Sequence, residues 1–223
     1  DRYKVHRPGP GANLAYAGPR LDDYKSCFSA KTMEAEESYA DLVRLIQALG
    51  SGTNVPYEQA LGSHMITDNF LKTMAVMLMA GCFDQLTGWN PHNYYLHRHP
   101  MTKRWSYLPW DLDVGFADKA FGRVPVIDGW HAAWPIPGGP PKPILENIVN
   151  HPKLLATYRK FARSILETYF EPQKLKVRLR KLYAVVEAAL RTDPFPARRA
   201  TNPEDTGYES ILYSIEQFME KRY

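Results

Sequence analysis

The chain has 223 residues, of which 44% are hydrophobic and 23% are charged, and its formal net charge is +4. This composition excludes intrinsic disorder and supplies apolar surface for one sizeable core with a small appended lobe, rather than for two full domains. The most apolar run, residues 74–83, is too short to span a bilayer, so no transmembrane segment is expected.

Basic residues gather at two places, RLRK at 178–181 and ARR at 197–199. Two interpretations fit this pattern. One is a site for an anionic partner such as a phosphate or a membrane surface, and the other is a solvated helix face followed by a basic loop. No basic stretch is interleaved with aromatic residues as in single-strand nucleic-acid sites, so no nucleic-acid partner is expected.

The first third of the chain predicts loops followed by a helix. Residues 1–25 are rich in Gly, Pro and Tyr without a sustained period, which is typical of loops with at most short strands. Residues 26–32 favour one strand. The segment from Glu37 to Leu49 places its apolar residues on one helical face, and the sequence Gly-Ser-Gly at 50–52 ends that helix.

Two more helices are expected before the centre of the chain. A short one is predicted at 56–61, and a longer one begins at Thr67 or Asp68 and runs to about Cys82. The longer segment is apolar nearly all round, which predicts a central buried helix. The two cysteines, Cys27 and Cys82, fit either one disulfide or two buried thiols, and the absence of a CxxC pair gives no indication of structural zinc.

A β-hairpin and a helical C-terminal part complete the prediction. Residues 93–99 and 104–110 are aromatic-rich strands joined by the turn Pro-Met-Thr-Lys. The Pro- and Gly-rich segment 111–141 reads as a long loop, and such loops in compact domains commonly carry function. The remaining helices are predicted at 142–149, 152–169, 172–191 and 206–222.

Four oxygen-bearing side chains surround the predicted hairpin: Asp84, Asn93, Asp111 and Asp113. A tight antiparallel hairpin brings its entrance and exit together, so Asn93 and the two later aspartates are expected to meet. Asp111 and Asp113 would share one side of an extended segment. Together with an amide oxygen, they form a hard oxygen site suited to Mg²⁺ or Mn²⁺.

The order of these residues matches that of protein kinases. There an Asp accepts the proton of the substrate hydroxyl, an Asn binds metal, and a later Asp joins metal to phosphate. Other interpretations stay open: strand-end Asp and Asn residues often form turns, and the same carboxylates fit a metal-dependent phosphoesterase. His92, His97 and His99 with Asp84 also fit a transition-metal hydrolase, and His92 has the best position of the three for a site.

The region from Asp84 to Phe116 resembles the signature of the CotH (spore coat protein H) kinase family. The resemblance lies in an Asp after a hydrophobic helix, the sequence His-Asn-Tyr-Tyr-Leu opening a strand at 92–96, and Pro-Trp-Asp-Leu-Asp-Val-Gly-Phe closing it at 109–116. Weaker similarity at 12–24, 29–32, 39–49 and 144–170 extends it over roughly residues 12–190.

The resemblance implies an α+β, atypical protein-kinase-like fold. Residues 1–35 would be a remnant of the small lobe and the hinge, and residues 36–223 the helical large lobe carrying the catalytic hairpin at 84–116. It implies ATP and Mg²⁺ or Mn²⁺ as cofactors and Ser or Thr of a protein as acceptor. The implied site residues are Asp84 as catalytic base, Asn93, Asp111 and Asp113 as metal ligands, and Lys31 and His92 as cofactor-binding residues.

The sequence departs from the kinase pattern in one respect, since it contains no Gly-rich phosphate loop and no Lys in a clear small-lobe context. The alternative function is therefore a non-catalytic, pseudokinase-like scaffold with coat or surface assembly partners. By resemblance, a secreted, cell-surface or spore-coat location is expected, with the cytoplasm as the other option.

Overall fold

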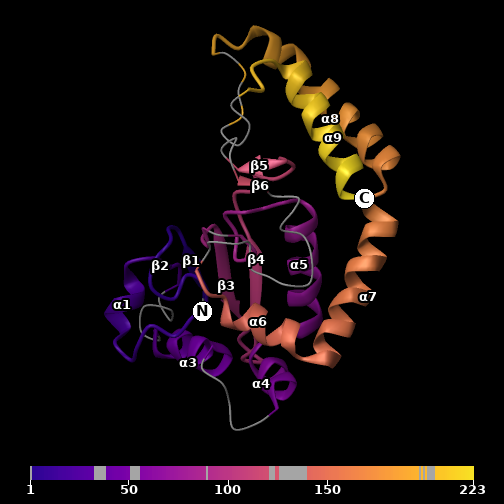
Figure 1. The fold of residues 1–223 in the computed structure, drawn as a ribbon. Coiled ribbons are helices and arrows are strands. Elements are labelled where there is room, and N and C mark those ends of the chain that lie inside the picture. Colours follow the sequence, from indigo (N-terminus) through magenta and orange to yellow (C-terminus); the bar gives the residue numbers. More distant parts are fainter. Residues whose placement is uncertain are drawn as a thin grey trace.

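A computed structural model describes residues 2–32, 39–50, 56–88, 90–120, 124–125, 140–195, 197, 199 and 204–223. Its centre is a four-stranded antiparallel sheet in the order β2–β1–β3–β4 (Figure 1). The strands are β1 (Arg2–Val5), β2 (Phe28–Ala30), β3 (Tyr94–Arg98) and β4 (Trp105–Pro109). Within the described residues the fold is thus α+β, as expected.

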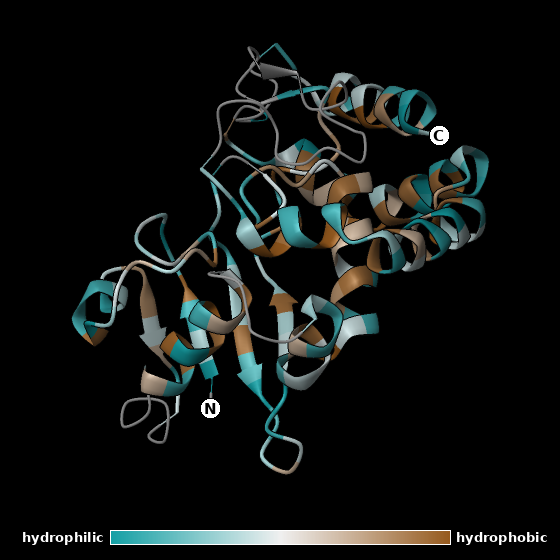
Figure 2. Cartoon of the chain, turned by 60° about the horizontal axis from the view of Figure 1, so that its bottom comes forward, coloured by the Kyte–Doolittle hydropathy of each residue, from teal (hydrophilic) through white to brown (hydrophobic). Residues whose placement is uncertain are grey.

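The predicted hairpin is confirmed by the pairing of β3 with β4, which sets Tyr94 opposite Pro109. Alternate residues of both strands are buried, among them Leu96 and Tyr107, so one face of the sheet packs on the core. Figure 2 shows hydrophobic and hydrophilic residues alternating along the strands. The turn closes with Lys103 in the left-handed region at φ 57°, where its N–H donates to the carbonyl of His99.

The N-terminal segment contributes more to the sheet than its composition predicts. β1 pairs with both β2 and β3, so a segment expected to be mostly loop supplies an inner strand. It also contains a short helix, α1 (Leu21–Lys25), which the prediction of loops misses. β1 and β2 share one sheet with the hairpin. The predicted boundary near residue 35, between a small-lobe remnant and a large lobe, stays a prediction.

The helices α3 (Tyr39–Gly50), α4 (Tyr57–His64) and α5 (Thr67–Met79) match the predicted elements within a few residues. The predicted start of α3 at Glu37 lies outside the described residues. Helix α5 is buried along most of its length, as expected of a central helix. It ends before Cys82 because Gly81 takes φ 66°, a left-handed conformation that favours glycine.

Four helices follow in the C-terminal half: α6 (Pro143–Asn150), α7 (Pro152–Tyr169), α8 (Pro172–Thr192) and α9 (Tyr208–Arg222). Helix α7 packs on α5, and α8 and α9 form a pair that extends away from the sheet (Figure 1). The buried guanidinium of Arg222 holds this pair to the core by donating to the carbonyls of Leu78 and Met79 at the end of α5.

The described residues decide the state of the two cysteines and part of the long loop. Cys27 and Cys82 are both buried free thiols, so the disulfide alternative is wrong. The long segment 111–141 contains two short paired strands, β5 (Lys119–Ala120) and β6 (Val124–Pro125), while residues 126–139 lie outside the described residues. No helix in the part of the chain that is described has the length and apolar character needed to cross a membrane.

Candidate active site

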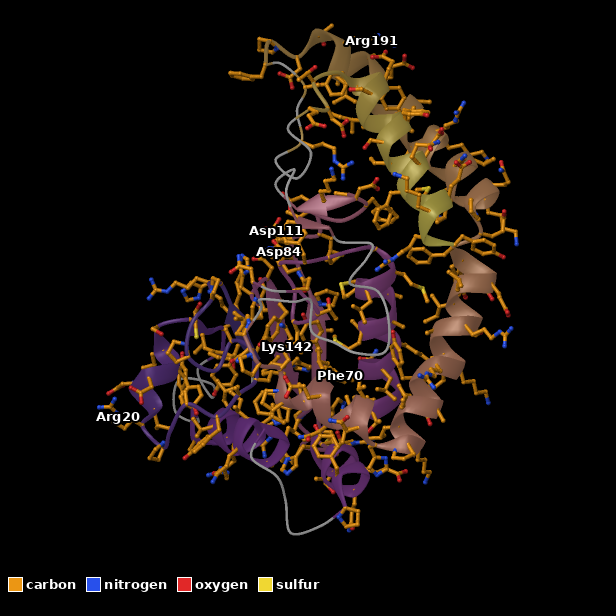
Figure 3. The ribbon with its side chains drawn as sticks, viewed as in Figure 1. Arg20, Phe70, Asp84, Asp111, Lys142 and Arg191 are labelled. Atoms are coloured by element: carbon orange, nitrogen blue, oxygen red, sulfur yellow. The ribbon has the colours of Figure 1, made fainter. Side chains whose placement is uncertain are left out.

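The candidate site lies at the end of the sheet where β3 begins and β4 ends. Asn93 precedes β3 and Asp111 follows β4, and both take left-handed backbone conformations, at φ 55° and φ 57°. The N–H of Trp110 donates to the carbonyl of Asn93 at 2.9 Å, which fixes the two chain segments side by side. Figure 3 shows Asp84 and Asp111 together at this end of the sheet. The predicted meeting of hairpin entrance and exit is therefore confirmed.

Asp84 and Asn93 form a buried hydrogen-bonded pair. The Asn93 side-chain nitrogen donates to Asp84 Oδ2 at 2.8 Å, and both residues are less than a tenth exposed. Asp84 Oδ1 is buried and has no hydrogen-bond partner among the described residues. A buried polar atom without a partner is costly, so it indicates a place where a further donor or a cation is expected.

The environment of Asp84 raises its pKa to about 6. Burial is the main cause, and the carboxylate of Asp113 adds to it, whereas His92 and the hydrogen bond from Asn93 act in the opposite direction. A carboxylate with a pKa near 6 is mostly ionised at neutral pH and is a better proton acceptor than an exposed aspartate.

This raised pKa predicts a pH-dependent stability. The ordinary value is 3.8, so the contribution of Asp84 to stability is fully present below about pH 4 and is lost as pH rises through about 6. In metal-free protein, the free energy of unfolding of wild type is expected to fall relative to Asp84→Asn by on the order of 2 kcal/mol between pH 4 and pH 7. Urea unfolding of both proteins across this range measures it, and a constant difference would contradict the shift.

Gln85 is a site residue that sequence reasoning misses. Its side-chain nitrogen donates to the carbonyls of Asn93 at 2.8 Å and Trp110 at 2.7 Å, and its Oε1 accepts from the Tyr107 hydroxyl at 2.8 Å. One fully buried amide thus holds the entrance and exit of the hairpin in place beside Asp84. Nothing in the sequence distinguishes this glutamine from a surface one, because its partners are mostly backbone carbonyls.

Asp111 and Asp113 are exposed, and Asp113 lies near enough to raise the pKa of Asp84 and of Cys82. The expectation that they share one side of an extended strand is wrong, because Asp111 leaves the extended region at φ 57° and the chain then turns. Among the described residues, no group of three or more His, Cys, Asp or Glu side chains converges as a metal site. One or two carboxylates, however, suffice for Mg²⁺ when phosphate oxygens and waters complete its shell.

Arg199 fixes the chain just beyond these aspartates. Its side chain donates to the carbonyls of Gly115 at 2.8 Å and Phe116 at 2.9 Å, and burial lowers its pKa. This residue belongs to the basic cluster at 197–199, so at least one member of that cluster acts within the fold rather than toward a partner.

The structure brings His92 to the site but not Lys31. The backbone N–H of His92 donates to the Asp84 carbonyl at 3.3 Å, and His92 lies near enough to lower the pKa of the Asp84 carboxyl. Lys31 is exposed, and its backbone N–H donates to the carbonyl of Arg2. Arg2 in turn pairs with His97, at the other end of β3. Lys31 therefore lies at the end of the sheet away from Asn93.

The other histidines do not complete a metal site with Asp84. His97 lies within β3 and His99 at its turn, where the His99 imidazole accepts from the N–H groups of Met101 and Thr102. Both are thus removed from the hairpin entrance that holds Asp84. Among the described residues, the geometry gives no support to the transition-metal alternative.

A cavity of about 470 Å³ opens beside the site, on the N-terminal side of His92. Its walls come from the loop after β1, from Asn90 and Pro91, and from Pro140. Nearby, the buried ammonium of Lys142 donates to the Pro140 carbonyl at 3.1 Å, and burial lowers its pKa to about 8. Neither the cavity nor the buried lysine was evident in the sequence, since the walls come from distant segments.

Comparison with known proteins identifies a family for this chain. The model of the family described as CotH kinase protein matches residues 13–223, nearly the whole chain. A comparison with curated proteins finds no significant match. The matched region contains Asp84, Gln85, Asn93, Asp111 and Asp113, which lie around the entrance and exit of the hairpin. The chain therefore belongs to the CotH kinase protein family.

Proposed function

We propose that this protein has an atypical protein-kinase-like fold and transfers phosphate from ATP, with Mg²⁺ or Mn²⁺, to Ser or Thr hydroxyls of a protein. The observation that carries the proposal is the buried Asp84–Asn93 pair, with one carboxylate oxygen left without a partner and a pKa near 6. Such a carboxylate suits a general base that accepts the proton of an attacking hydroxyl.

Each residue of the site has a distinct task in this proposal. Asn93 orients Asp84 with its amide nitrogen, which leaves its amide oxygen for a cation. Asp111, next to Trp110 at the hairpin exit, would supply a carboxylate to the same cation. Asp113 would be a second carboxylate ligand or would orient Asp111. A bound Mg²⁺ would neutralise the phosphate charge. The residues present therefore fit a metal that is held jointly with the nucleotide.

The exposed aromatic ring of Trp110, next to Asp111, supports a nucleotide as the ligand. Trp110 is 53% exposed and meets Tyr95 edge-on at 6.1 Å between ring centroids. The Lys4 ammonium lies 5.6 Å from the centre of the Trp110 ring. Flat exposed rings stack on bases, and an ammonium beside them attracts phosphate. Lys4 is thus better placed than Lys31 to contact a phosphate held near Asp111.

The proposal predicts metal-dependent nucleotide binding that requires Asp111. Wild type is expected to be stabilised against heat by ATP and Mg²⁺ together, and to transfer ³²P from ATP to a protein acceptor such as casein. Asp111→Asn is expected to lose most of both effects, whereas the matched control Asp22→Asn, at an exposed position in α1, keeps them. Binding without transfer would favour the pseudokinase-like scaffold, and no binding by wild type would contradict both functions.

A protein acceptor in a coat or surface assembly, and a secreted or spore-coat location, remain proposals that rest on the family alone. Immunogold labelling of cells that express the full gene product tests the location directly.

A further inference from the structure

The cations of α8 divide into two sets. Lys176, Arg180 and Arg191 form ion pairs with glutamates of α9, the Arg180–Glu216 pair at 2.7 Å among them. The remaining cations are exposed and form no ion pair in the described part of the chain; they are Lys174, Arg178 and Lys181. At 100° per residue these three lie on one side of the helix, opposite the side that forms the ion pairs with α9. The basic cluster at 178–181 thus contains one residue used within the fold and two that face outward.

Exposed apolar side chains share that side of α8. Val185 is 81% exposed, Leu182 is 58% exposed and Val177 is 56% exposed. Together with the three outward cations they form the outer face of α8, which carries no acidic residue. Within the described residues α8 buries none of its side chains, although it is 21 residues long. A solvated helix face accounts for the cations but not for these apolar residues.

The apolar surface continues from the outer face toward α9. Leu182 and Val185 also border an apolar groove of about 390 Å³ between the two helices, which Ile211, Leu212 and Ile215 line from α9. The pair extends away from the sheet (Figure 1), so a flat surface can reach it. On helices that lie on membranes, apolar side chains enter the boundary between headgroups and acyl chains, and the long side chains of neighbouring Lys and Arg residues extend to the headgroups.

We propose that the outer face of α8 docks on an anionic lipid bilayer. The three cations contact lipid headgroups, and Leu182 and Val185 enter the boundary between headgroups and acyl chains. A second copy of this face is a poor partner, because its outward cations would meet the same cations of the other copy. A bilayer supplies anionic groups and hydrocarbon together along the whole helix, without requiring a complementary shape. This inference does not depend on the proposed kinase activity.

Co-sedimentation of the full chain with vesicles tests the proposal. Wild type is expected to bind vesicles of phosphatidylcholine with 30% phosphatidylglycerol at 0.1 M NaCl, and not vesicles of phosphatidylcholine alone. Arg178→Glu with Lys181→Glu is expected to weaken that binding more than about tenfold, since each basic residue near an anionic surface contributes a severalfold gain in affinity. Val185→Asp is expected to weaken it as well, because it places a charge where an apolar side chain enters the lipid.

The matched control changes the same net charge elsewhere. Lys103→Glu with Arg104→Glu alters the hairpin turn and is expected to leave vesicle binding within about twofold of wild type. Circular dichroism and thermal unfolding confirm that each variant is folded. Equal loss of binding in both double variants would overturn the proposal, as would failure of wild type to bind the anionic vesicles. Competition by free glycerol phosphate at equal phosphate concentration would overturn it too, because it would identify a headgroup site without a bilayer. Binding of an acidic protein partner by a wild type that ignores vesicles would likewise overturn it.

Discussion

Replacement of Asp84 by Asn is expected to lower the rate constant of phosphate transfer by about 10²- to 10⁴-fold, the range typical of the loss of a general base. The amide of the new side chain has the same shape as the carboxylate, and its oxygen can still accept the hydrogen bond that Asn93 donates at 2.8 Å in the wild type. It cannot accept the proton of a hydroxyl. Single-turnover transfer of ³²P from ATP, measured with saturating Mg²⁺, gives the rate constant directly.

The same experiment separates a chemical from a structural role. Affinity for ATP with Mg²⁺ is expected to change by less than about fivefold in Asp84→Asn, because the proposed metal ligands are untouched. Asp22→Asn, which changes an exposed carboxylate in α1, serves as the control for loss of charge. A variant at Asp84 that transfers phosphate at the wild-type rate would remove the general base from the proposal.

Replacement of Gln85 by Leu is expected to destabilise the fold by about 3 kcal/mol, because it removes three hydrogen bonds of a fully buried side chain. The Trp110 carbonyl loses the donor at 2.7 Å, and the Tyr107 hydroxyl loses its acceptor. The Asn93 carbonyl keeps the bond from the Trp110 N–H. Urea unfolding measures the change as a shift in midpoint at constant slope.

Two further variants make this prediction specific. Tyr107→Phe removes only the hydrogen bond to Gln85 Oε1 and the longer one from the Leu86 N–H. It is expected to lower the free energy of unfolding by about 1 kcal/mol. Gln59→Leu, at an exposed position of α4, is expected to change stability by less than about 0.5 kcal/mol. If Gln85→Leu were as mild as Gln59→Leu, the amide would not be what holds the hairpin ends together.

The local pattern of the sequence was sufficient to predict most of the helices and the hairpin. Helix α5 is apolar nearly all round and is buried along most of its length, and the two aromatic-rich segments form the hairpin of β3 and β4, both as expected. These elements are set by short-range periodicity, which a single sequence displays. The sequence does not single out β1, because four residues are too few to show a clear alternation of apolar and polar side chains. Its inner position in the sheet depends on pairing with β2 and with the distant β3.

By itself the sequence predicted that Asn93 and Asp111 lie together, because a hairpin joins their positions, and that Asp84, close to Asn93 along the chain, lies beside them. The tertiary structure decided what those residues experience. Burial at the end of the sheet raises the pKa of Asp84 to about 6, and Gln85 and Arg199 fix the surrounding backbone through carbonyl groups that no residue pattern reveals. Lys31 lies away from the site, whereas Lys4 lies beside Trp110. Strand pairing, and not distance along the chain, determines which side chains are neighbours here.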